Sequence, residues 1–408
     1  MAPRFLFIVS GYPPLRTGGM ELSCQRLATA LARRGVGVVV LTLAAPDLPE
    51  DRIEAGVRVL RVITPWQVGP LWGVKYSLDV GMWMKRLEAE WDLALCFQLY
   101  LHSSVAVSIA GTLRKKIATR LANSGSGGDI EKMLAMRLGK KAVHHALRAD
   151  ALFPLSNDGA RELHGWKVAP ERLWRMPVFI DTVRFSPASS TPSPVFHYHG
   201  RFEKSKNLTG LIEAFALVHA AHPEARLQLV GDGGERAAIE EAARVSGAGE
   251  SIAILPWTPH VEKHLGNVLC AVSASHSEGL SNALVEAMAC GVPAIATDVS
   301  GTRDLLDPAG ELGTADAVRG HGFMRARHGL IAPPGDVKAM AAAMRAMLED
   351  AQLRPSLADG LDEHARERFS EGAAVSAFLN AAEAILAGRP STPHERGFAL
   401  DLFDGAEA

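Results

Sequence analysis

The chain has 408 residues, of which 48% are hydrophobic and 22% charged, and this length predicts two α/β domains of about 190 residues each. A net charge of −2 and a pI of about 6.7 argue against nucleic acid as a bulk partner. The four cysteines lack metal-ligand spacing, no apolar run reaches transmembrane length, and Met1 leads almost directly into a strand. We therefore expect reduced thiols, no signal peptide and a cytoplasmic location, either soluble or peripheral at the inner face of a membrane.

The N-terminal part begins with a strand–helix–strand pattern. Residues 5–9 form an apolar run typical of a buried parallel strand, and residues 36–43 form a second such run. Gly18 and Gly19 stand at the entrance of the helix between them. The chain lacks G-x-G-x-x-G here, which counts against a dinucleotide enzyme. From the residues alone, the glycine pair is either a plain turn or a place where the backbone approaches a ligand.

A polar loop follows the strand predicted at residues 116–122. It contains Asn123, Ser124 and Asp129, which are candidates for orienting a hydroxyl acceptor. The next predicted helix, residues 130–147, lies in the basic region 114–148. A basic amphipathic surface can hold a protein on anionic lipid, whereas the plainer interpretation is a solvated helix face.

The second domain is predicted to begin after the Pro- and Ser-rich linker at residues 187–194, which gives domains at 1–190 and 191–370. A strand at 195–199 precedes Arg201 and Lys206, two cations able to neutralise a diphosphate. Exposed cations in a turn are the alternative. His197 and His199 alternate along this strand and are interpreted as packing residues.

A second βαβ unit is predicted between residues 269 and 297. Ser281 and Asn282 are good N-cap residues for its helix, and Gly291 followed by Pro293 ends that helix. Glu278 lies in the loop and Glu286 in the second helical turn, so both carboxylates can face one ligand at the carboxyl edge of the sheet. Carboxylates suit vicinal hydroxyls and the helix N-terminus suits an anion, which indicates a ligand such as a nucleotide sugar.

The order of residues in this stretch is highly specific. Ser-Glu-Gly-x-x-Asn-x-x-x-Glu-Ala-Met-Ala-Cys-Gly-x-Pro, which contains Glu278 and Glu286, resembles the signature of family 4 (group 1) glycosyltransferases, retaining enzymes of the GT-B fold. Gly-Gly-x-Glu at Gly18 and Gly-Arg-x4-Lys at Arg201 match further family motifs. The resemblance implies an α/β fold of two Rossmann-like domains facing across a cleft. The helix at about 371–390 would pack back on the first domain, and the tail, 391–408, is expected to be weakly ordered.

The same resemblance implies roles for individual residues. Glu286 would hold the ribose hydroxyls of a nucleoside diphosphate sugar, and Arg201 and Lys206 would bind its diphosphate. Arg201, Lys206 and Glu278 are the predicted catalytic residues, with Glu278 at the transferred sugar. The predicted donor-binding residues are Gly18, Gly19, Leu255, Gly279, Leu280, Ser281, Asn282 and Glu286.

The expected reaction is a retaining, metal-independent sugar transfer, with a UDP-sugar favoured over a GDP-sugar and no cofactor or metal. The acceptor would be a glycan, a lipid-linked sugar or a small molecule. Two departures from the family stand out: Ser124-Gly125 replaces the usual histidine–glycine, and Val178-Phe179 replaces the usual Asn-Gly. No histidine base is therefore assigned. The alternatives are a sugar-nucleotide epimerase of similar fold and a scaffold protein that binds nucleotide sugars without transferring them.

Overall fold

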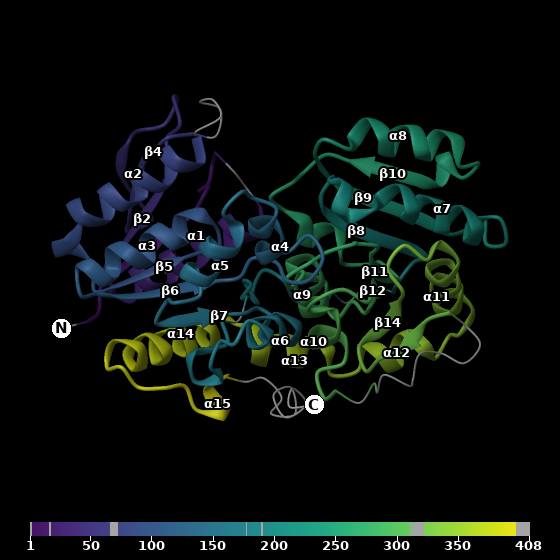
Figure 1. The fold of residues 1–408 in the computed structure, drawn as a ribbon. Coiled ribbons are helices and arrows are strands. Elements are labelled where there is room, and N and C mark those ends of the chain that lie inside the picture. The colour runs from purple at the N-terminus through teal and green to yellow at the C-terminus, as the bar shows by residue number, and fades with distance from the viewer. Residues whose placement is uncertain are drawn as a thin grey trace. The chain divides into compact units, whose positions relative to one another are not determined.

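The computed structural model describes residues 2–15, 18–65, 72–176, 178–188, 191–310, 312 and 322–396. The chain forms two compact units, with unit 1 comprising Met1–Phe179 and Glu371–Ala408, and unit 2 comprising Ile180–Ser370 (Figure 1). The division precedes the predicted linker at residues 187–194. The reason is that Ile180 already belongs to unit 2, where its amide donates to the carbonyl of Phe369 at 3.0 Å and its side chain joins the core.

Unit 1 is built on one sheet, which in its described residues has seven strands in the order β3-β4-β2-β1-β5-β6-β7. All neighbours are parallel except β3, which runs antiparallel to β4. The elements before the crossing to unit 2 are β1 (Phe5–Ile8), α1 (Gly19–Arg33), β2 (Val38–Leu43), β3 (Asp51–Glu54), β4 (Val57–Ile63), α2 (Trp72–Arg86), η1 (Glu88–Glu90), β5 (Leu93–Cys96), α3 (Leu101–Thr112), β6 (Lys116–Arg120), α4 (Asp129–Leu134), α5 (Gly139–Ala146), β7 (Ala151–Phe153), α6 (Asn157–Gly165) and η2 (Pro170–Arg172).

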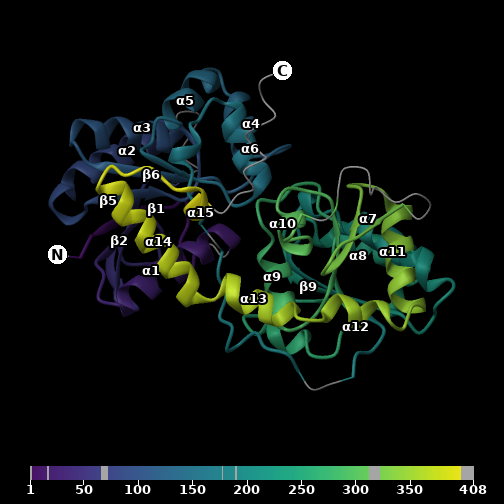
Figure 2. The same cartoon turned by 90° about the horizontal axis from the view of Figure 1, so that it is seen from below.

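Two helix layers cover this sheet because alternate residues of its strands face opposite sides. Phe5 and Phe7 of β1 join the core under α1 and α14 (Glu371–Leu386). Leu6 and Ile8 join the core under α2 and α3. Figure 2 shows α14 alongside α1, on one face of the sheet. The continuous apolar runs seen in the sequence are therefore buried on both faces.

Unit 2 repeats the plan, with seven strands among its described residues in the order β10-β9-β8-β11-β12-β14-β13. Only β13 is antiparallel to its neighbour. Its elements are β8 (Val195–Arg201), η3 (Lys204–Lys206), α7 (Leu208–His219), β9 (Arg226–Asp232), α8 (Arg236–Val245), η4 (Gly249–Ser251), β10 (Ile252–Leu255), η5 (Val261–His264), β11 (Cys270–Ser273), α9 (Asn282–Ala289), β12 (Ala294–Thr297), α10 (Thr302–Leu306), β13 (Met324–Arg325), β14 (Gly329–Ala332), α11 (Val337–Glu349), α12 (Leu353–Ala358) and α13 (Leu361–Phe369).

The two faces of the second sheet are also covered. Phe196 and Tyr198 of β8 join the core formed with α7, α8 and α11. The other core contains residues of α9, α10 and α13. These parallel sheets and their covering helices make the expected α/β class correct for both units.

Two expectations need correction. The single basic helix predicted at 130–147 is instead α4 and α5, because the backbone at Gly139 approaches that of Met133 so closely that a Cβ would lie 1.8 Å from the Met133 carbonyl oxygen. The first part of the expected weakly ordered tail is packed: the Ser391 amide donates to the Glu171 carbonyl at 2.9 Å, and α15 (Pro393–Arg396) follows. Residues 397–408 lie outside the described part.

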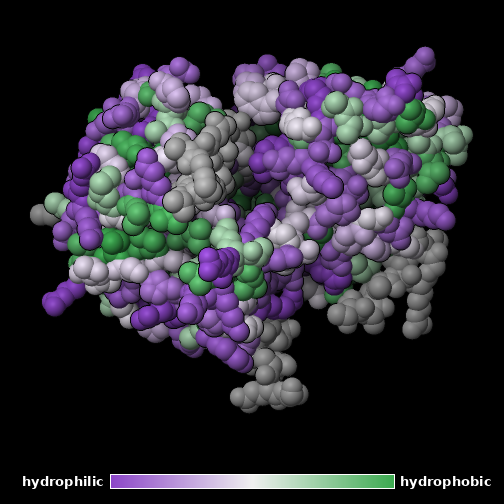
Figure 3. Space-filling model, turned by 45° about the horizontal axis from the view of Figure 1, so that its top comes forward, coloured by the Kyte–Doolittle hydropathy of each residue, from purple (hydrophilic) through white to green (hydrophobic). Residues whose placement is uncertain are grey.

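The remaining expectations concern the cysteine thiols, membrane-spanning helices and the surface. All four cysteines are buried and free. In the described part of the chain, every helix is too short or too polar to cross a membrane. Figure 3 shows patches of hydrophobic residues set among hydrophilic ones on the visible face.

Candidate functional site

The β11–α9–β12 segment of unit 2 has the predicted strand–helix–strand form. β11 and β12 pair in parallel, and the Ser281 side chain caps α9 by accepting from the Leu284 amide at 3.5 Å. Gly291, with φ of +69°, follows the end of α9 in the left-handed conformation. The loop that carries Glu278 therefore opens at the carboxyl edge of the sheet, where α/β folds bind ligands.

Glu278 and Lys206 form an ion pair at this edge. The Lys206 Nζ donates to Glu278 Oε1 at 2.5 Å, and Ser275 Oγ donates to the same oxygen at 2.9 Å. The His276 amide also donates to the Ser205 carbonyl at 2.8 Å, which joins the two loops. Both loops follow neighbouring strands, β8 and β11. The fold thus brings together two of the predicted catalytic residues, although they are 72 positions apart.

Arg201 occupies a more open position. Its side chain is 56% exposed, and its guanidinium pairs with the Glu203 carboxylate at 2.6 Å. An exposed pair of this kind contributes only about 0–1 kcal/mol, so a diphosphate can displace Glu203 at little cost. The backbone is more firmly held, because the buried Tyr198 hydroxyl donates to the Arg201 carbonyl at 3.0 Å. The Arg201 backbone is therefore held in place, whereas its exposed guanidinium can change partners.

Glu286 lies on the inner side of α9 and is only 8% exposed. Its Oε2 accepts from His199 Nε2 at 3.1 Å. His199 in turn contacts His197, ring nitrogen to ring nitrogen, at 3.1 Å. Burial, followed by the nearby His199, lowers the pKa of His197 to about 3, so that ring is neutral at pH 7.

Sequence reasoning missed this role of the two histidines. Their alternation on β8 is equally consistent with packing, and nothing in the sequence links His199 to Glu286, 87 residues later. The signal was a polar residue repeated at alternate positions of a strand that is otherwise buried. Such residues need hydrogen-bond partners, and here a predicted ligand-binding carboxylate is one of them.

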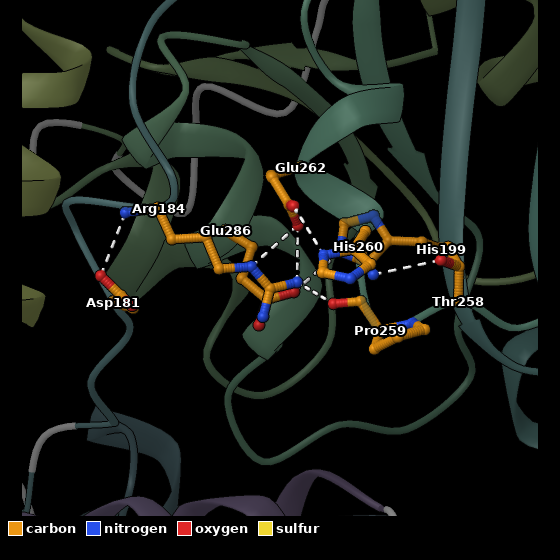
Figure 4. Close-up of polar contacts among 8 residues, drawn as sticks. All are labelled: Asp181, Arg184, His199, Thr258, Pro259, His260, Glu262 and Glu286. Atoms are coloured by element: carbon orange, nitrogen blue, oxygen red, sulfur yellow. Dashed lines mark hydrogen bonds and ion pairs between the residues drawn. The ribbon is translucent and has the colours of Figure 1, made fainter.

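Two more segments of unit 2 border the candidate site. Leu255 is the last residue of β10 and packs partly buried against the core around α9. The next loop is anchored by Arg184, whose Nε donates to Glu262 Oε2 at 2.8 Å and whose guanidinium also contacts the Pro259 carbonyl. Figure 4 shows these contacts together with His199 and Glu286.

The Gly279 backbone is confined by Gly301, the N-cap of α10. Gly301 has φ of +80°, and a Cβ there would lie 2.4 Å from the Gly279 carbonyl oxygen. This contact requires glycine and fixes the start of the stretch that contains Gly279, Leu280, Ser281 and Asn282.

The remaining candidates lie in unit 1. Gly18 is the N-cap of α1, and its carbonyl accepts from the Leu22 amide at 3.0 Å. Gly19 is the first residue of that helix, which follows β1. The glycine pair thus lies at a helix N-terminus after a parallel strand, where backbone amides can meet an anion.

The predicted acceptor loop is held in shape by hydrogen bonds to the Asp129 side chain. This side chain is 1% exposed, and its oxygens accept from the Ala122 amide at 2.7 Å and from Gln98 Nε2 at 3.2 Å. Burial raises its pKa to about 6. Asp129 therefore holds the loop in shape. Asn123 is partly exposed, whereas Ser124 is buried at 5% exposed, so Asn123 is the better placed of the two to meet an acceptor.

Comparisons with known proteins agree with this architecture. The family described as "Glycosyl transferases group 1" matches residues 179–368, and the "Glycosyl transferase 4-like domain" matches residues 18–178. Glycogen synthase of Mycobacterium tuberculosis is 26% identical over 403 residues, with 90% of each chain covered. LpsD, a lipopolysaccharide core biosynthesis glycosyltransferase of Rhizobium meliloti, is 30% identical over 44% of this chain and 47% of its own.

Several curated relatives are matched over only 17% to 51% of their own length. Among solved structures, that of Anabaena HepE in complex with UDP-glucose covers 94% of this chain and 100% of its own, at 18% identity and a TM-score of 0.72. The two family matches meet between residues 178 and 179, one residue before the structure divides into its two units. The chain belongs to the group 1 glycosyltransferases, family 4, and has the GT-B fold.

Proposed function

We propose that this chain transfers a sugar from a nucleoside diphosphate sugar, a UDP-sugar in the first place, to a hydroxyl acceptor with retention of anomeric configuration. The observation that carries the proposal is the pairing of Lys206 with Glu278 at the sheet edge, beside the helix that bears Glu286. The bound UDP-glucose of the HepE structure supports UDP as the nucleotide.

In this proposal, each side chain has one task. Glu286 accepts hydrogen bonds from the two ribose hydroxyls, a pair that one carboxylate can hold. Lys206 and Arg201 bind the diphosphate, and their bonds strengthen as negative charge develops on the leaving nucleotide. Glu278, released from Lys206 by the incoming phosphate, accepts from hydroxyls of the transferred sugar.

Retention follows, in this proposal, from departure and attack on the same face of the sugar. The C1–O bond to the diphosphate breaks, the acceptor oxygen bonds to C1, and a phosphate oxygen takes the acceptor proton. Charge neutralisation falls to Arg201 and Lys206, so we propose that no divalent metal takes part. The acceptor is a hydroxyl of a glycan, a lipid-linked sugar or a small molecule, and it lies against the loop that contains Asn123 and Ser124.

A lipid-linked acceptor would bring unit 1 to a membrane, and we propose its basic region, residues 114–148, as the contact. Lys132, Arg137, Lys140 and Lys141 are exposed there, as are Leu138 at 67% and Leu134 at 41%. This combination suits an anionic surface. Co-sedimentation with phosphatidylserine vesicles should fall after replacement of Lys140 and Lys141 by glutamate, and equal sedimentation of the variant would argue against the contact.

The test of the function is donor cleavage in the presence of EDTA. UDP-, GDP- and ADP-sugars are incubated with the protein and mixed sugar acceptors, and release of nucleoside diphosphate is measured. Release from one donor class with EDTA present is the expected result, and NMR of the product should show the donor's anomeric configuration. An inverted product contradicts retention, and activity that requires added Mn²⁺ contradicts metal independence. Epimerised donor without acceptor would indicate the epimerase, and binding without cleavage the scaffold.

A further inference from the structure

The side chains of His197 and His199 lie on the face of β8 that is directed toward α9. Phe196 and Tyr198 join the core on the opposite face, and the alternation of a strand places the two histidines away from them. His197 is 0% exposed and His199 8% exposed. The rings are therefore closed off from bulk water, and each of their nitrogens needs a partner within the protein.

Those partners form a continuous series across three elements. Gln228 of β9 contacts His197 Nδ1 at 2.9 Å, His197 Nε2 contacts His199 Nδ1 at 3.1 Å, and His199 Nε2 contacts Glu286 Oε2 at 3.1 Å. His264 stacks on His197, with ring centroids 6.5 Å apart and planes 12° apart. The series ends on the carboxylate assigned to the ribose.

The chemistry of the groups fixes the hydrogen bonds at both ends of the series. An ionised carboxylate only accepts, so His199 donates from Nε2 to Glu286. The Gln228 Oε1 atom also only accepts, so His197 donates to it from Nδ1. The contact between His197 Nε2 and His199 Nδ1 joins the two rings. A series of this kind restricts ring rotation at His199 and hence the orientation of the carboxylate.

We propose that His199, held by His197 and Gln228, is a positioning residue that orients Glu286 towards the two ribose hydroxyls of the nucleotide. This inference rests on the proposed function, because Glu286 meets a ribose only if a nucleotide binds there. A carboxylate accepts up to about four hydrogen bonds, so the contact with His199 leaves it capacity for the ribose. The role is distinct from that of the diphosphate cations, which hold a different part of the ligand.

The test separates ribose recognition from general damage. Dissociation constants are measured for the nucleoside diphosphate that binds the wild-type protein and for its 2′,3′-dideoxy analogue, in wild type, His199→Leu and His199→Gln. His199→Leu should weaken binding of the normal nucleotide about tenfold, the effect of one hydrogen bond to a charged group, and change binding of the analogue less than about twofold. His199→Gln, whose amide can donate to Glu286, should restore most of the loss.

His222→Leu is the matched control, because this ring contacts a glutamate carboxylate at 3.0 Å elsewhere in unit 2. It should leave both constants unchanged. If His199→Leu weakens binding of both ligands equally, or of neither, the positioning role is overturned. In that case, nucleotide binding by the wild type still supports the proposed donor site. If the wild type binds none of the nucleotides, the proposed function fails and this inference with it.

Discussion

At the scale of single residues, the candidate site is defined by charges that the fold holds close together. Lys206 and Glu278 are 17% and 14% exposed, so their pair is screened less than a surface pair. In the proposed function, a diphosphate competes with Glu278 for the lysine, and it carries more negative charge. Lys206 would then be paired with Glu278 in the free protein and with the diphosphate in the complex.

Replacement of Lys206 by alanine should lower turnover by at least about tenfold while the fold is kept, because one charge-assisted hydrogen bond is worth about 1.5–3 kcal/mol. Lys204→Ala is the matched control, since Lys204 belongs to the same short helix but is exposed. Steady-state release of nucleoside diphosphate measures both variants. Near-wild-type turnover of Lys206→Ala would contradict the proposed binding of the diphosphate by Lys206.

The buried His197 makes unit 2 sensitive to acid. Its pKa is lowered from 6.5 to about 3 in the folded state, so the folded state binds this proton less readily than the unfolded chain. The stability that His197 contributes is present above pH 6.5 and is lost as the pH falls towards 3. Between pH 6.5 and pH 5 the unfolding free energy falls by about 2 kcal/mol, because one pKa unit corresponds to about 1.4 kcal/mol.

Urea unfolding of the wild type and of His197→Gln at several pH values measures this contribution. The difference in unfolding free energy between the two proteins should shrink as the medium is made more acidic. A difference that stays constant from pH 7 to pH 4 would show that His197 is not held neutral.

At the scale of elements, the loop that contains Gly279 depends on the close approach between Gly301 and Gly279. Gly301→Ala should destabilise unit 2 by more than the roughly 1–2 kcal/mol of a left-handed alanine, because its Cβ would also collide with the Gly279 carbonyl oxygen. It should weaken nucleotide binding as well. Gly247→Ala isolates the backbone term, since φ there is +76° and a Cβ would meet nothing within 4 Å. Equal unfolding free energies for the two variants in urea would contradict this account.

Many of the elements were predictable from local pattern. Local sequence pattern predicted β1, β8 and β11 within a few residues, and the N-cap Ser281 marked the start of α9. The break between α4 and α5 was not predictable, because it depends on the backbone contact between Gly139 and Met133. The link from His199 to Glu286 was beyond sequence reasoning for the same reason, since it exists only after β8 and α9 pack together.

At the scale of the whole molecule, the chain crosses from unit 1 to unit 2 and returns. α14 follows unit 2 in sequence, yet its Phe378 packs in unit 1 with ring centroids 5.1 Å from Phe5 and 5.9 Å from Phe7. The resemblance to the family made this return predictable. The position of the division between the two units was harder to predict. The Pro- and Ser-rich stretch at 187–194 resembles a linker, but Phe185, which precedes it, is already buried in the core of unit 2.

Phe378→Ala should destabilise unit 1 by about 3–5 kcal/mol, the usual cost of removing a buried phenylalanine ring. Calorimetry with and without nucleotide should show that the transition stabilised by ligand is little changed. Phe215→Ala, which removes a buried ring from unit 2, should instead lower that transition. A reversed pattern would show that the ligand binds outside unit 2.

The proposed function depends on unit 2 binding a nucleoside diphosphate sugar through Arg201 and Lys206. Its most direct test is a thermal-shift panel of UDP-, GDP- and ADP-sugars, without added metal, on the wild type and on Arg201→Ala. A ligand at about 100 times its dissociation constant stabilises by about 2.7 kcal/mol, which is readily measured. We expect a shift with one nucleotide class, UDP before the others, and we expect the shift to be lost in the variant. No shift with any of the nucleotides, or an equal shift in Arg201→Ala, would contradict it.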